Sequence, residues 1–105
     1  MNELVIKETL TAGLASRHES QERVLFITSV PAEREAILRG LAGAPRFDVL
    51  AGGVGPAAAA ACTAKALAAH SYRLVVCAGI GGGFAGKAEV GSLVVAKEIV
   101  AADLG

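Results

Sequence analysis

Aromatic residues are scarce in this chain, which has three phenylalanines, one tyrosine and no tryptophan among 105 residues. Proteins that bind single-stranded nucleic acid usually combine basic side chains with aromatic rings on which the bases stack. Here ten basic side chains are balanced by ten acidic ones, and the lysines and arginines stand singly. We therefore expect neither a nucleic acid nor an anionic membrane surface as a partner.

Long apolar runs are also missing, although 53% of the residues are apolar. No run approaches the ~18 residues that a membrane-spanning helix needs. Glu3, Lys7 and Glu8 interrupt the first apolar cluster, so we do not expect a signal peptide. Cys62 and Cys77 lie in apolar segments and are too few for a disulfide framework, which favours a reducing cytoplasm.

Glycine, in contrast, is concentrated in segment 73–100, around which the chain is organised. An apolar run at 74–78 leads into glycines 79, 81, 82 and 83, and a second apolar run follows at 93–100. This pattern predicts a strand, a glycine loop and a second strand. Such a loop can expose backbone N–H groups to an oxygen-rich ligand, or it can be a tight connection that binds nothing.

Residues 81–86 also match the dinucleotide pattern G-x-G-x-x-G. That motif requires a helix after the glycines, because the helix N-terminus holds the pyrophosphate. The residues that follow lead into a β-rich run instead, so we interpret the match as accidental. We expect neither a cofactor nor a metal.

Strands and helices are predicted to alternate along the chain, which indicates an α/β fold. Strands are expected near 24–28, 48–52, 73–78 and 92–100, and helices near 31–41 and 56–70. Residues 1–23 have no sustained period and are expected to form an extension outside the core. Because two helices cannot cover four strands this apolar, residues 24–105 are predicted to be the N-terminal part of a larger domain.

Glu33 is the candidate catalytic residue. It belongs to the first turn of the helix expected at 31–41, and it shares a face with Ile37 and Leu41. This places its carboxylate near the carboxyl end of the strand at 24–28, where α/β proteins bind ligands. The alternative is an acid that complements the helix dipole, worth only about 0.3–1 kcal/mol.

Four short motifs give the chain a family resemblance. They are TSVPAEREA at 28–36, AGGVGP at 51–56, AGIGGGFA at 78–85 and VGSLVV at 90–95. In this order and spacing they resemble the nucleoside phosphorylase and nucleosidase superfamily, from about residue 24 to the last residue. The resemblance implies a three-layer α/β/α fold, of which this chain holds the N-terminal half.

The resemblance also implies a function, which is hydrolysis of the N-glycosidic bond of an inosine-like purine nucleoside with release of hypoxanthine. Glu33 corresponds to an acid that helps to activate the attacking water. Backbone groups at Gly81 and Gly82 line the pocket in relatives, and Val30 and Val54 match positions that contact the 5′ substituent of the sugar. The full-length protein is implied to be a homo-oligomer.

Two alternatives stay open. A carboxylate beside the nucleophile's site would repel phosphate, which favours a hydrolase over a phosphorylase, but another purine nucleosidase or a phosphorylase has the same fold. A non-catalytic α/β fragment that binds a partner through uncovered sheet edges is the second. Ile80 stands where several relatives have serine, so a hydrogen bond from that side chain is not expected here.

Overall fold

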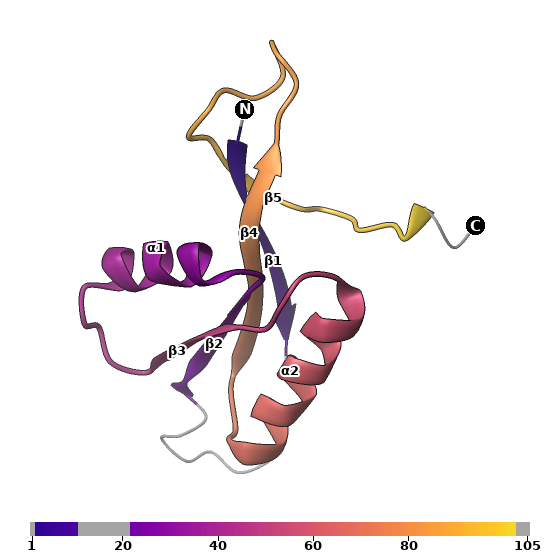
Figure 1. Cartoon of the computed structure of the whole chain (residues 1–105). Coiled ribbons are helices and arrows are strands. Elements are labelled where there is room, and N and C mark those ends of the chain that lie inside the picture. Colours follow the sequence, from indigo (N-terminus) through magenta and orange to yellow (C-terminus); the bar gives the residue numbers. More distant parts are fainter. Residues whose placement is uncertain (1, 11–21, 103–105) are drawn as a thin grey trace.

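The structure, a computed structural model, describes residues 2–10 and 22–102, and Figure 1 shows the arrangement of its elements. In chain order these are β1 (Asn2–Leu10), β2 (Val24–Thr28), α1 (Pro31–Leu41), β3 (Phe47–Ala51), α2 (Pro56–Ala69), β4 (Leu74–Gly82) and β5 (Leu93–Val95). The predicted alternation of strands and helices from residue 24 onward is confirmed.

The five strands form one mixed sheet in the order β3-β2-β4-β1-β5. Strand β2 runs parallel to β3 on one side and to β4 on the other, with Val24 opposite both Phe47 and Leu74. The chain therefore passes from β2 through α1 to one neighbour and returns through α2 to the other. The predicted α/β class is confirmed, and the carboxyl ends of β2, β3 and β4 share one edge of the sheet.

Helix α1 begins and ends where the sequence predicts, because its signals are local. Pro31 occupies the first turn, where the missing N–H has no intrahelical partner, and Val30 before it is extended. At the other end Ala42 is left-handed, with φ of 49°, and its N–H donates to the carbonyl of Leu38. This is a left-handed C-terminal cap, here formed by alanine rather than the usual glycine.

Helix α2 packs against the sheet through small side chains. Leu25, Ile27 and Val75 from the sheet form the core cluster with Ala66 of α2, and Tyr72 completes it. Alanine offers little apolar area, so the helix must approach closely to bury the sheet. The same approach requires glycine at 52, where a Cβ atom would lie 2.8 Å from the Cβ of Cys62.

Residues 2–10 differ from the predicted extension outside the core. They form β1, which pairs antiparallel with β4 and parallel with β5. Strand pairing is made by backbone N–H and C=O groups, so it does not require the sustained hydrophobic period that the sequence lacks here. The remainder of the predicted extension, 11–21, lies outside the described residues.

The glycine segment also differs from the predicted loop. Strand β4 continues through Gly79, Gly81 and Gly82, which lie opposite Val5, Glu3 and Asn2 of β1, and none of these glycines has a positive φ. Pairing with β1 holds them in the strand, so their conformational freedom is not used here. The last strand is shorter than predicted, because β5 covers only residues 93–95.

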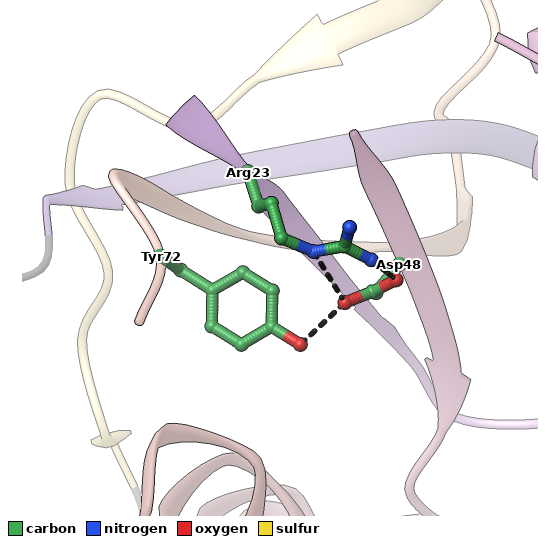
Figure 2. Close-up of polar contacts among 3 residues, drawn as sticks. All are labelled: Arg23, Asp48 and Tyr72. Atoms are coloured by element: carbon green, nitrogen blue, oxygen red, sulfur yellow. Dashed lines mark hydrogen bonds and ion pairs between the residues drawn. The ribbon is translucent and has the colours of Figure 1, made fainter. Parts of the chain in front are cut away.

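A polar cluster joins the amino ends of the three parallel strands. The carboxylate of Asp48 accepts hydrogen bonds from the guanidinium of Arg23 and, at 2.6 Å, from the hydroxyl of Tyr72, and Figure 2 shows both groups directed at it. Burial and this bond to Asp48 raise the pKa of Tyr72 to about 12. The cluster therefore fixes residues that precede or begin β2, β3 and β4.

Tyr72→Phe tests the contribution of this cluster to stability. The variant keeps the buried ring but removes the hydroxyl that donates to the charged Asp48. We expect the free energy of unfolding to fall by about 1–2 kcal/mol, measured by urea denaturation. Glu35→Gln, at an exposed ion pair on α1, is the control and should change it by less than about 0.5 kcal/mol. Equal stability of Tyr72→Phe and wild type would show that the hydroxyl contributes nothing.

Candidate functional site

Glu33 lies at the carboxyl ends of the central strands and is held there by three backbone amides. Its Oε1 accepts hydrogen bonds from the N–H groups of Ser29, at 2.9 Å, and Val30, at 3.2 Å. Its Oε2 accepts from the N–H of Ile80 in β4, at 2.9 Å. The residue is only 9% exposed. The candidate acid is thus attached to the glycine segment, 47 residues further along the chain.

Local geometry explains this position. Strand β2 ends at Thr28, whereas β4 runs on to Gly82, so the amide of Ile80 lies beyond the end of β2. The carboxylate of Glu33 supplies the acceptor that β2 no longer provides. Because Glu33 is the third residue of α1, its bond from the Val30 N–H is also the return half of a capping box, and its charge faces the positive end of the helix dipole.

Burial and hydrogen bonding act on the pKa of Glu33 in opposite directions. Burial raises the pKa, while the amide hydrogen bonds from Ile80, Ser29 and Val30 lower it. The net result is a pKa below the ordinary value of 4.5. Bonds to the charged form of a carboxyl stabilise that form. Glu33 is therefore a carboxylate at neutral pH, as a group that accepts a proton or orients a water must be.

Within residues 2–10 and 22–102, hydrogen-bond donors leave one acceptor position of this carboxylate unfilled. Two oxygens offer about four positions for donors, of which Oε1 uses two and Oε2 one. The open position is on Oε2, next to Gly79, where an added Cβ atom would lie 3.1 Å from that oxygen. A side chain at residue 79 would therefore crowd Oε2.

The lowered pKa of Glu33 predicts a pH-dependent contribution to stability. A carboxyl with a lower pKa in the folded chain favours folding above its ordinary value of 4.5, and this contribution is lost as the pH falls through the folded value. We expect Glu33→Gln to be less stable than wild type at pH 7 and the difference to shrink below pH 4.5. Urea denaturation of both proteins from pH 7 to pH 3 measures it. A difference that stays constant would contradict the lowered pKa.

The other predicted site residues are only partly brought together. Val30 donates its amide N–H to Glu33, and the residue is 37% exposed. Val54 is 77% exposed and follows Gly53, whose N–H donates to the carbonyl of Ser29, so both valines lie beyond the ends of β2 and β3. Gly81 and Gly82, by contrast, pair with β1.

Two features of the site were not predicted from the sequence. The first is the amide of Ile80, which donates a hydrogen bond to Glu33; at this position the sequence indicated only that a serine hydroxyl is missing. The apolar side chain of Ile80 is exposed. The second is the role of Gly79, which has no side chain and so lets the carboxylate of Glu33 lie close to the backbone of β4. Gly79 does not adopt a positive φ. The sequence offers one weak signal for both features, a glycine near the end of a predicted buried strand. That signal does not identify Glu33 as the side chain that contacts it.

A hollow of about 840 Å³ lies elsewhere, along the edge strand β3. Residues of α1, α2 and β3 line it, together with the cluster of Arg23, Asp48 and Tyr72, and none of the predicted site residues does.

Within residues 2–10 and 22–102, no three His, Cys, Asp or Glu side chains come together as metal ligands. In the same ranges no helix is both long and apolar enough to cross a bilayer.

Comparison with known proteins assigns this arrangement to a family. The sequence pattern of the Phosphorylase superfamily matches residues 12–105, and the chain belongs to that superfamily. The resemblance found in the four motifs is thereby confirmed. The matched region includes Glu33 and the strands that position it, but it begins after β1.

Two curated relatives are futalosine hydrolases. The protein from Streptomyces coelicolor is 48% identical over 102 residues, which cover 78% of this chain and 43% of the relative. The protein from Acidothermus cellulolyticus is 47% identical over 94 residues, which cover 77% of this chain and 38% of the relative. The chain thus spans less than half the length of these relatives. No solved structure matches.

Proposed function

We propose that this chain supplies the water-activating part of a nucleosidase that hydrolyses the N-glycosidic bond of futalosine and releases hypoxanthine, a step of menaquinone biosynthesis. The observation that carries the proposal is Glu33, a carboxylate that three backbone amides keep ionised at the carboxyl ends of the parallel strands. The names of the two relatives support the choice of substrate.

In the proposed reaction Glu33 accepts a hydrogen bond from a water molecule at Oε2 and takes its proton as the oxygen attacks the anomeric carbon. The departing purine leaves an oxocarbenium-like sugar, so the attack needs a polarised nucleophile. Val30 and Val54 contact the 5′ substituent of the sugar, and backbone at Gly81 and Gly82 lines the pocket. An ionised carboxylate at this place favours neutral water over phosphate, which it repels.

The proposal also includes a cellular location, the cytoplasm. Cys62 and Cys77 are free thiols, which is consistent with a reducing cytoplasm. The substrate is a small purine nucleoside, and the full-length enzyme is a homo-oligomer. In related enzymes of the superfamily the acid that serves the purine lies further along the polypeptide than residue 105, so we do not assign the group that protonates the purine to a residue of this chain.

A chimera tests the proposal. This chain replaces the matched region of the Streptomyces coelicolor relative, and hypoxanthine release from futalosine is followed by chromatography with and without phosphate. We expect phosphate-independent release by the chimera and no substantial release by the 105-residue chain alone. Turnover that requires phosphate and yields a sugar phosphate would identify a phosphorylase instead. A folded chimera that releases no base under either condition would contradict the proposed function.

A further inference from the structure

Strand β3 is an edge strand, since among residues 2–10 and 22–102 it pairs with β2 alone. The backbone groups of residues 46, 50 and 52 face β2, because they form hydrogen bonds with Val24 and Thr28. Successive residues of a strand direct their N–H and C=O groups to opposite sides. The N–H and C=O groups of residues 47, 49 and 51 therefore face away from the sheet.

One of these outward groups already has a partner. The carbonyl of Val49 accepts a hydrogen bond from Nε of Arg34, 2.9 Å away, and the same guanidinium pairs with the exposed Glu35. A charged side chain on an edge strand discourages unselective pairing with other strands. The other outward groups form no hydrogen bond with the described part of the chain, and they are the groups with which an added strand pairs.

The hollow of about 840 Å³ lies along this open edge. All five residues of β3 line it, α1 contributes Arg34 and Leu38, and α2 contributes residues between 62 and 69. The edge of the sheet therefore lies in a groove between the two helices, which we call the β3 groove. Phe47 and Leu50 are each 36% exposed and belong to opposite faces of the sheet, so they offer apolar contacts on both sides of an added strand.

The β3 groove carries an excess of positive charge. Arg23, Arg34 and Lys65 line it, whereas Asp48, the carboxylate among its lining residues, is already bonded to Arg23 and Tyr72. Lys65 is exposed and forms no ion pair with any described residue. A partner with acidic side chains therefore matches the groove, while a second copy of the same groove would bring like charges together.

We propose that the β3 groove binds an extended acidic segment of another protein, which adds a strand to β3. Backbone pairing provides the affinity of such strand addition, and the side chains along the groove provide its selectivity. The added strand displaces Arg34 from the carbonyl of Val49, and a carboxylate of the segment then pairs with the freed guanidinium. A neutral strand does not offer this exchange. The proposal does not depend on the nucleosidase activity.

Fluorescence anisotropy of a labelled synthetic peptide of alternating valine and glutamate tests the proposal. The same peptide with glutamine in place of glutamate is the control ligand. Both the 105-residue chain and the chimera are titrated, so that any covering of the edge in a complete domain is detected. We expect the acidic peptide to bind both proteins, about tenfold more tightly than the glutamine peptide, and to bind more weakly as salt is added.

Two pairs of variants locate the binding. Ala51→Pro removes an outward N–H without removing a bond to β2, and it should weaken binding of the acidic peptide by about tenfold or more. Ala51→Ser keeps that N–H and should bind within about twofold of wild type. Lys65→Glu should weaken binding by about five- to tenfold, whereas Lys87→Glu, outside the hollow, should change it by less than about twofold.

Residue-resolved hydrogen exchange of the wild-type chain needs no variant. With the acidic peptide bound, the amides of residues 47, 49 and 51 should exchange more slowly, while those of 48 and 50, which face β2, should change little. Absence of binding to either protein, equal binding of the glutamine peptide, or protection without this alternation would overturn the proposal. Protection of 47, 49 and 51 by self-association that excludes the peptide would also overturn it, and would indicate a second copy as the occupant.

Discussion

Gly79→Ala is expected to lower kcat for hypoxanthine release by the chimera by about 10- to 100-fold, with little change in KM. The new Cβ atom would lie 3.1 Å from Oε2 of Glu33, closer than most real contacts allow. The carboxylate must then move away from the Ile80 amide and from the water that it is proposed to activate. A displacement of about 1 Å at a reacting group can cost about 100-fold in rate, so the few tenths of an ångström that the contact requires favour the lower end of this range.

Gly40→Ala is the matched control for this prediction. Gly40 lies in α1, and an added Cβ atom there meets nothing within 4 Å. Alanine also favours helix over glycine, so the control should not lose stability. Steady-state kinetics of both variants provide the comparison. A Gly79→Ala chimera that is folded and has wild-type kcat would show that crowding of Oε2 is of no consequence to the reaction.

Glu33→Gln should have the larger effect, a fall in kcat of about 10²- to 10⁴-fold. Glutamine keeps the size of the side chain, but it carries no negative charge and cannot take the proton of water. Its amide nitrogen is also a donor, so if it occupied the place of Oε2 it would face the Ile80 N–H without bonding to it. Single-turnover measurement of base release separates this effect from product release.

Glu35→Gln provides the control for the loss of charge. Glu35 lies on the same helix two residues further along, is exposed and pairs with Arg34. Its removal should leave kcat within about twofold of the wild-type chimera, since screened surface charges contribute little. A Glu33→Gln chimera with the same small effect would mean that the buried acid only caps α1.

The central α/β unit was predictable because its signals are local. Pro31 and the residues around it mark the start of α1, and the short β-favouring run at 24–28 marks β2. The position of Glu33 at the carboxyl end of that strand follows from the same local pattern. The bond from the Ile80 amide does not follow from that pattern, because it depends on how far β4 extends beyond the end of β2.

Features that depend on distant pairing were not predictable. Whether glycines 79, 81 and 82 form a loop or a strand depends on their partners in β1, which lie 74 to 80 residues away in sequence, and β1 itself has no alternating pattern that marks it as a strand. Likewise, Arg23, Asp48 and Tyr72 come from three separate segments. They meet only because the amino ends of the parallel strands β2, β3 and β4 lie side by side. The identity of a single residue does not indicate which distant residue it contacts in the folded chain.

The most direct test of the account compares the single variants with the double variant Gly79→Ala/Glu33→Gln in the chimera. If residue 79 acts only by leaving Oε2 of Glu33 accessible, the double variant should have the same single-turnover rate as Glu33→Gln alone. Multiplication of the two separate losses, or a Glu33→Gln rate close to wild type, would contradict the assignment of Glu33 as the group that activates water.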